Sequence, residues 1–227
     1  PVNLEYMYST FLLQRAEIAG VLIVNNPEAL RNASEKLHTA WFSQCCAPTT
    51  VSRKMSRLRS FIDEYRDIVV KPLNGMGGAS VFRVRHDDPN LNVILETITK
   101  NGKPSAMAQR YIPEITAGDK RILMIEGEPY PQALARIPAA GESRGNLAAG
   151  GTGEGVDLSD RDRWICGQVG PALREHGIIV AGLDVIGDYL TEINVTSPTC
   201  IRELDKQYGT DIASQLMDAI AARLERR

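Results

Sequence analysis

The sequence predicts an α/β protein, and three observations lead to this fold class. Strand-like and helix-like segments alternate between residues 51 and 111, which is the pattern of a small α/β unit. Two β-rich segments, 121–125 and 130–137, flank Glu126-Gly127-Glu128-Pro129 and predict a hairpin. The last third of the chain then alternates again. With 227 residues, 43% of them hydrophobic, the chain can bury one substantial core or two smaller ones.

The first fifty residues predict mainly helix. In order, they predict a helix at 1–20, a strand at 21–24, a short helix at 27–30 and a helix at 34–43. The strand follows from the run Val21-Leu22-Ile23-Val24. Pro27 suits the first position of a helix, and Ser34 has the side chain of an N-cap for the helix that carries Lys36.

The middle of the chain predicts the alternating unit. Its elements are a strand from 51, a helix at 55–66, strands at 67–71 and 79–84, a helix at 90–101 and a strand at 106–111. The hairpin follows. Residues 138–155 then form a predicted loop that contains Arg144 and six glycines. A long loop inside a compact domain is a lid or a disordered linker, and the arginine favours a lid.

The remaining elements return to the α/β pattern. They are a helix at 159–176, strands at 178–186 and 190–195, and helices at 199–208 and 212–227.

Composition excludes several classes of protein. A formal net charge of -2 without a long basic run argues against a nucleic-acid partner. No apolar run approaches the roughly 18 residues of a membrane span. The four cysteines fit neither a disulfide framework nor a zinc motif, which indicates a reducing compartment and predicts a cytoplasmic protein.

A glycine-rich turn follows the strand that ends at Lys71. The segment Gly75-Met76-Gly77-Gly78-Ala79-Ser80 lacks the lysine that ends a Walker loop and the third glycine of a Rossmann turn. What remains is a lysine before a flexible turn between two strands, a geometry in which bare amides can approach a polyphosphate. A tight hairpin turn without a ligand is the alternative.

Asp184, Glu192 and Asn194 are candidate metal ligands. Residues i and i+2 of a strand share a face, so Glu192 and Asn194 point the same way. With a three-residue loop at 187–189, Asp184 pairs with Glu192 and the three oxygen donors converge. A two-residue loop would place the two carboxylates on opposite faces. Oxygen donors without histidine suit Mg²⁺, with Mn²⁺ as a second candidate.

Five cations come from five different elements: Lys36, Lys71, Arg121, Arg136 and Arg144. If they meet, they form a clamp that spreads the charge of a transferring phosphoryl group. Together with the metal ligands they predict a site for Mg-ATP, and hence an ATP-dependent ligase.

Four segments carry a resemblance to a known family: Lys71–Gly78, Ala135-Arg136-Ile137-Pro138, 144–151 and Glu192-Ile193-Asn194-Val195-Thr196-Ser197-Pro198. Together they resemble the bacterial glutathione synthetases of the ATP-grasp superfamily, over essentially the whole chain. The resemblance implies an ATP-grasp fold, two α/β subdomains that grip ATP between them. It divides the chain into the end of an N-terminal substrate domain (1–33), a small subdomain (34–112) and a large subdomain (113–227) with the lid at 138–155. The rest of the N-terminal domain is expected to be missing.

The resemblance also implies a role for each candidate. Lys36 and Lys71 would contact ATP phosphates, and Gly75, Gly77 and Gly78 would form a phosphate loop. Gln109, Tyr111 and Ile112 match the strand that holds adenine, with Asp119 near the ribose. The catalytic arginines would be Arg121, Arg136, which faces the γ-phosphate, and Arg144, which closes with the lid. Asp184, Glu192 and Asn194 would hold Mg²⁺.

The implied reaction joins γ-glutamylcysteine and glycine. ATP would phosphorylate the cysteinyl carboxylate, and the glycine amine would attack the acyl phosphate to give glutathione. The family also implies a homotetramer. Two alternatives are another ATP-grasp carboxylate-amine ligase, which would share the ATP residues, and an ATP-binding module without catalysis.

Overall fold

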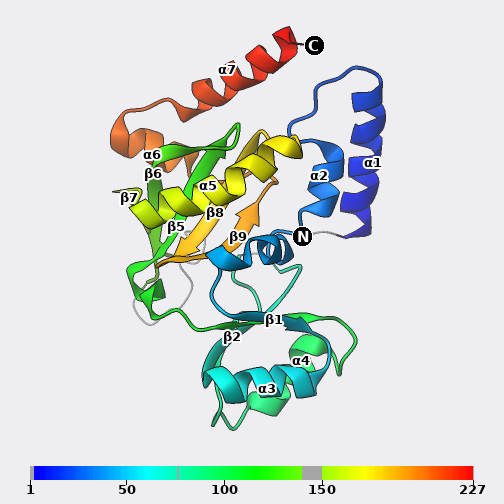
Figure 1. Ribbon diagram of the computed structural model, residues 1–227, viewed down its shortest axis with the longest axis vertical. Coiled ribbons are helices and arrows are strands. Elements are labelled where there is room, and N and C mark those ends of the chain that lie inside the picture. Colours follow the sequence, from blue (N-terminus) through cyan, green and yellow to red (C-terminus); the bar gives the residue numbers. More distant parts are fainter. Residues whose placement is uncertain (1–2, 76, 140–149, 227) are drawn as a thin grey trace.

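The computed structural model describes residues 3–75, 77–139 and 150–226, and it contains two antiparallel sheets in two lobes (Figure 1). A four-stranded sheet has the order β1-β4-β2-β3, and a five-stranded sheet has the order β7-β6-β5-β8-β9. The fold combines helices with two sheets, which confirms the predicted α/β (α+β) class, and the antiparallel strands correspond to its α+β form. No helix in the described ranges has the length and apolar character needed to cross a membrane.

The smaller lobe is the predicted alternating unit. Its elements are β1 (Thr49–Ser52), α3 (Met55–Tyr65), β2 (Asp67–Pro72), β3 (Phe82–Arg85), α4 (Leu91–Thr99) and β4 (Ala106–Arg110). Both helices cover one face of the sheet (Figure 1), where Leu58, Ile62 and Leu95 are fully buried against Ile68 and Val70. Strand β3 is shorter than predicted, because it begins only at Phe82, and residues 79 and 80 still belong to the turn.

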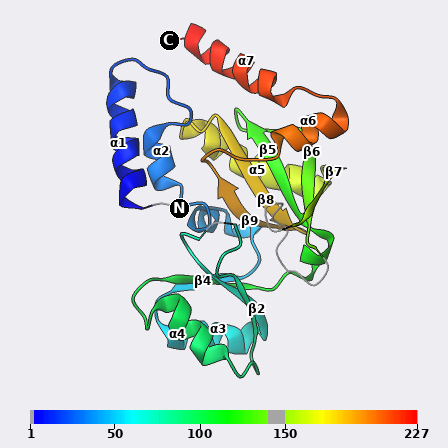
Figure 2. The same cartoon turned by 180° about the vertical axis from the view of Figure 1, so that it is seen from behind.

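The larger lobe is built on the predicted hairpin. Its strands are β5 (Asp119–Ile125), β6 (Glu128–Ile137), β7 (Thr152–Asp157), β8 (Val180–Ile186) and β9 (Tyr189–Asn194). Helix α5 (Asp160–Glu175) packs on one face, where Ile165, Val169 and Leu173 meet Ile122. Helix α6 (Ile201–Tyr208) packs on the other face through Leu204 (Figure 2).

Helix α5 is tied to strand β5 by a buried ion pair. Ser159 and Asp162 form a capping box at the start of the helix. Lys120 donates from its Nζ to both carboxylate oxygens of Asp162 at 2.6 Å, and Asp162 is fully buried. Because side chains alternate along a strand, Asp119 and Arg121 lie on the opposite face of β5. The ion pair therefore holds β5 in place from the face opposite to the two candidate site residues.

The predicted loop at 138–155 is wrong at its C-terminal end. Residues 152–157 form β7, which pairs with β6 and places Gly153 opposite Arg136. The outer edge of β7 is held by Gln207, whose side-chain amide accepts from Gly155 N at 2.6 Å and donates to Gly153 O at 3.1 Å. Residues 140–149, the centre of the predicted lid, lie outside the described residues.

The N-terminal segment runs beside the larger lobe as α1 (Leu4–Ile18), α2 (Pro27–Asn32) and the 3-10 helix η1 (Leu37–Cys45). The predicted strand at 21–24 is wrong, because that stretch joins neither sheet. Instead the Asn25 side chain accepts from the amides of Ile179 and Val180 and donates to the carbonyls of Val180 and Val195. It thereby holds the segment against the ends of the strands.

The predicted helix at 34–43 is also wrong in its start and type. The 3-10 helix begins at Leu37, and Lys36 occupies the N-cap position without a side-chain capping bond. Glu35 instead accepts a hydrogen bond from Ile193 N at 2.9 Å, which sets the chain along the open edge of β9. Lys36 therefore follows a turn that lies beside β9, and its ammonium reaches Glu192. The chain ends in α7 (Ile212–Glu225), which the pairing of Arg223 with Glu126 ties to the β5–β6 turn.

Candidate active site

A cleft lies between the two sheets and brings most of the predicted site residues together. From the smaller lobe it is lined by strands β2, β3 and β4, and from the larger lobe by β5, β8 and β9. The candidates in its wall are Lys71, Gly78, Gln109, Tyr111, Ile112, Asp119, Asp184 and Glu192. Val69, Val81, Ile115 and Ile186 add apolar surface. A cleft with an apolar part and a charged part suits an amphiphilic ligand such as a nucleotide.

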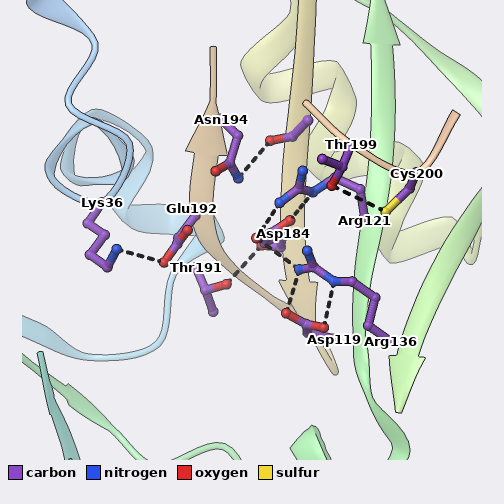
Figure 3. Close-up of polar contacts among 11 residues, drawn as sticks. Lys36, Asp119, Arg121, Arg136, Asp184, Thr191, Glu192, Asn194, Thr199 and Cys200 are labelled. Carbon is purple, nitrogen blue, oxygen red and sulfur yellow. Dashed lines mark hydrogen bonds and ion pairs between the residues drawn. The ribbon is translucent and has the colours of Figure 1, made fainter. Parts of the chain in front are cut away.

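Of the two predicted lysines, Lys71 lines this cleft, and Lys36 lies beside it against Glu192. Lys71 is the penultimate residue of β2 and is only 6% exposed; burial lowers its pKa, and the charge of Glu192 acts against this shift. Lys36 is 4% exposed and donates from Nζ to Gly75 O at 2.5 Å, while its ammonium lies 3.0 Å from Glu192 Oε1 (Figure 3). Lys36 thus connects the glycine turn with the carboxylate of β9.

The glycine turn has the backbone that the residue type predicts. Gly77 and Gly78 have φ of +64° and +75°, in the left-handed region that residues other than glycine rarely adopt. At Gly75 an added Cβ would lie 2.9 Å from Pro72 Cγ, so a side chain would crowd the turn. Met76 lies outside the described residues.

Two arginines and two aspartates form a buried charge network on β5, β6 and β8 (Figure 3). Arg121 donates to both oxygens of Asp184, at 2.5 and 3.0 Å, and Arg136 donates to both oxygens of Asp119, at 2.9 and 2.5 Å. Arg136 also lies 3.0 Å from Asp184 Oδ2. The sequence predicted these residues as candidates, but their mutual pairing, across 63 residues for Arg121 and Asp184, has no sequence signal.

The network shifts the two carboxyl groups in opposite directions. Burial acts to raise the pKa of Asp184, but Arg121 and Arg136 outweigh it and leave the pKa below its ordinary value. For Asp119, burial and the neighbouring charge of Asp184 raise the pKa to about 6 despite Arg136. Burial likewise opposes the charge of Arg136, yet the two aspartates raise its pKa, so it remains a cation.

The pairing of Asp184 with Glu192 is confirmed, although the predicted loop is wrong. The turn contains two residues, because Ile186 pairs with Tyr189, and not three. A β-bulge between Asp184 and Val185 on the pairing ladder takes up the extra residue, Thr191. Thr191 donates from Oγ1 to Asp184 O at 3.1 Å. A two-residue turn alone would have put the carboxylates on opposite faces, and the bulge restores them to one face.

Asp184, Glu192 and Asn194 make a donor set that fits Mg²⁺. The carboxylates are direct cross-strand neighbours, and Asn194 lies two residues further along the same strand. The Asn194 amide nitrogen donates to Gly182 O at 3.3 Å, which leaves its oxygen available. Counting only His, Cys, Asp and Glu among the described residues, no group of three lies together. The third protein ligand would therefore be the asparagine amide.

The cleft wall beside Tyr111 also contains Arg83 and Arg110, which the sequence did not predict as site residues. The Arg83 guanidinium lies over the Tyr111 ring at 3.6 Å, and Arg110 donates to Tyr189 OH at 2.8 Å, which joins the two lobes. Arg83 and Val81 both line the cleft, and their spacing of two in the strand predicted at 79–84 was the available signal. Arg144 lies outside the described residues, and its predicted role stays a prediction.

Comparisons with known proteins identify the relatives of this chain. The family model "Prokaryotic glutathione synthetase, ATP-grasp domain" matches residues 35–209, and the model of the N-terminal domain of the same enzymes matches residues 1–31. A glutathione synthetase from Pseudomonas aeruginosa is 62% identical over 227 residues, which is all of this chain and 72% of the relative. One from Shewanella oneidensis is 59% identical over 224 residues, covering 99% and 71%.

Solved structures extend the likeness at the level of fold. The D-cycloserine synthetase DcsG superposes with a TM-score of 0.71 at 19% identity, over 96% of this chain and 79% of that one. D-alanine–D-alanine ligase from Bacillus anthracis, solved with ATP, gives 0.65 at 17% identity, over 94% and 73%. The ATP-grasp ligase PsnB, solved with Mg and ADP, gives 0.68 at 20% identity, over 95% and 67%.

Proposed function

The chain belongs to the prokaryotic glutathione synthetases, and from this premise we propose how its own residues carry out the reaction. The enzyme is an ATP-dependent ligase that joins γ-glutamylcysteine and glycine to give glutathione, ADP and phosphate. Its cofactors are ATP and Mg²⁺. A carboxylate is a poor electrophile, so phosphate is first installed on the cysteinyl carboxylate as a leaving group.

The apolar part of the cleft holds the base, and the charged part holds the phosphates. Gln109, Tyr111 and Ile112 take the adenine at the end of β4. Lys71 and Lys36 bind the phosphates, supported by their burial and by the contact of Lys36 with the glycine turn. The amides of Gly75, Gly77 and Gly78 add hydrogen-bond donors. Buried cations act strongly on phosphate because water does not screen them.

The arginines stabilise the phosphoryl group as it moves. The cysteinyl carboxylate attacks the γ-phosphorus, the bond to the bridging oxygen breaks, and ADP leaves. Arg121 and Arg136 spread the negative charge of the transferring group, and their pairing with aspartates holds them in place before the substrate arrives. Mg²⁺, when bound by Asp184, Glu192 and Asn194, neutralises the phosphate oxygens.

The second step forms the amide. The glycine nitrogen, after losing its proton, attacks the carbonyl carbon of the acyl phosphate, and inorganic phosphate leaves. We propose that Arg144 and the segment before β7, residues 138–151, keep water from the acyl phosphate, since hydrolysis would waste ATP.

The observation that carries the residue assignment is the convergence of Lys71, Asp184 and Glu192 in one cleft. The experiment measures ADP release from Mg-ATP and γ-glutamylcysteine, with and without glycine, in the wild type and in Glu192→Gln. Glycine-dependent release that falls at least tenfold in the variant supports the assignment, about 1.4 kcal/mol of transition-state stabilisation. Glu96→Gln, an exposed glutamate of α4, is the matched control. Unchanged release in Glu192→Gln would remove Glu192 from the metal site.

The domain division, the homotetramer and the cytoplasmic location belong to the same proposal. Residues 1–33 would end a substrate domain, 34–112 would form the small subdomain and 113–227 the large one. Leu4, Phe11, Leu12 and Ile18 of α1 are exposed apolar residues, which supports their burial in a larger assembly. Sedimentation velocity of the chain tests the tetramer. The cysteines Cys45, Cys46, Cys166 and Cys200 are all free, which suits a reducing compartment.

A further inference from the structure

Asp119 and Arg136 are brought together by the backbone before their side chains interact. Asp119 is the first residue of β5, and its direct cross-strand partner on β6 is Arg136. Gly118, just before it, has φ of +101°, and an added Cβ there would lie 3.0 Å from the Arg136 carbonyl oxygen. The chain therefore enters β5 at close range to Arg136, in a conformation that suits glycine.

The side chains complete this contact with two parallel hydrogen bonds. Arg136 donates from Nε and NH2 to the two oxygens of Asp119, and both side chains are largely buried. A bidentate pair fixes the plane of the guanidinium as well as its position, which a single contact does not. The same NH2 also reaches Asp184. Arg136 is thus shared between Asp119 and a carboxylate assigned above to the metal site.

We propose that Asp119 is a positioning residue for catalysis, whose carboxylate holds the Arg136 guanidinium in the orientation needed at the transferring phosphoryl group. This inference rests on the role proposed for Arg136 and adds a function to the ribose contact that the family resemblance predicts for Asp119. A carboxylate has about four lone-pair sites, and the arginine uses two of them. Without Asp119, Arg136 would keep Asp184 as its acidic partner in the network and would turn toward it, away from the phosphate.

The test is the kinetics of Asp119→Asn with two nucleotides, ATP and 2′,3′-dideoxy-ATP, which lacks both ribose hydroxyls. A misplaced arginine should lower kcat by up to about 10²-fold. The loss should be similar with both nucleotides, while KM for ATP changes little. A loss confined to ATP, or a rise in KM with unchanged kcat, would mean that Asp119 only reads the ribose and would overturn the proposal.

A double-variant cycle links the effect to Arg136. In an Arg136→Lys background, which cannot form the bidentate pair, Asp119→Asn should change kcat by less than about twofold. Additive losses would contradict positioning through Arg136. Asp119→Glu retains the charge and is expected to recover part of the lost kcat, and failure to recover any would also count against the proposal.

The matched control is Glu126→Gln at the other end of β5. Glu126 also accepts two hydrogen bonds from an arginine, Arg223, at 2.6 and 2.7 Å, but it lies on the β5–β6 turn away from the cleft. Its kcat should match the wild type. Circular dichroism melting curves show whether each variant is folded. Absence of glycine-dependent turnover in the wild type would refute the proposed function itself, whereas an active wild type with an unaffected Asp119→Asn refutes only the positioning role.

Discussion

Replacing Lys120 by methionine tests how much the buried ion pair behind the active site stabilises the larger lobe. The substitution keeps most of the side-chain volume but removes the only cation that contacts Asp162 in the described structure. Asp162 would retain the hydrogen bonds from the backbone amide and hydroxyl of Ser159. A fully buried carboxylate would then lack a charged partner.

The expected cost follows from the burial of the pair. Removing one partner of a buried ion pair typically costs about 3–5 kcal/mol, because the other charge stays buried and uncompensated. The Lys120 side chain is 20% exposed and Ser159 still donates to Asp162, so the lower end, about 3 kcal/mol, is expected. For a protein of this size that corresponds to a fall in Tm of roughly 6–12 °C.

Urea unfolding followed by circular dichroism measures this loss. Lys103→Met, at an exposed lysine, should stay within about 0.5 kcal/mol of the wild type. Adding Asp162→Asn to Lys120→Met should regain part of the loss, because the double variant no longer buries a lone charge. A loss below about 1 kcal/mol for Lys120→Met, or no recovery in the double variant, would refute the reasoning.

Three further outcomes are expected. Lys71→Met should weaken ATP binding, measured by calorimetry, by roughly 10- to 100-fold, since a charged hydrogen bond contributes about 1.5–3 kcal/mol. The same substitution should not lower the Tm measured without nucleotide, because burial already disfavours the charge of Lys71. Gly155→Ala should cost about 1–3 kcal/mol in urea unfolding, because the new Cβ would lie 2.3 Å from the Tyr208 ring, and Tyr208→Leu should relieve that cost. Burial raises the pKa of Cys46 to about 11 and of Cys166 to about 12, so both thiols should react slowly with a disulfide reagent at pH 8 and quickly after unfolding. Since unfolding then releases their protons, the free energy of unfolding should fall as the pH rises above about 9.

The sequence predicted most of the fold because local patterns decide most of its elements. The helices α3, α5 and α6 and the hairpin β5–β6 appear within a few residues of their predicted positions. The failures come from partners that a local pattern does not contain. Val21 and its neighbours have strand-forming side chains, but a strand also requires a neighbouring strand to pair with. Here the contact with the larger sheet is made by the Asn25 side-chain amide, which donates to the carbonyls of Val180 and Val195.

In the candidate site, too, some features could be predicted from local patterns in the sequence and others could not. The prediction that Asp184 pairs with Glu192 rested on a three-residue loop at 187–189; the pairing is confirmed, but it arises from a two-residue turn with a bulge. The bulge at Thr191 could not be predicted, because this sequence allows both a two-residue turn with a bulge and a three-residue turn without one. Both arrangements pair Asp184 with Glu192. The contacts of Arg121 and Arg136 with aspartates depend on the packing of three strands, which spacing along the chain does not specify.

The side-chain amide of Gln207 also protects the edge of β7 from pairing with a strand of another molecule. Strand β7 is an outermost strand, and unpaired backbone groups on such a strand can recruit a strand from another molecule. Gln207 engages Gly155 N and Gly153 O as an adjoining strand would, without offering a further edge beyond itself. Replacing Gln207 by an apolar residue would reopen these two groups, so the first sign of its loss in a concentrated solution would be self-association through β7.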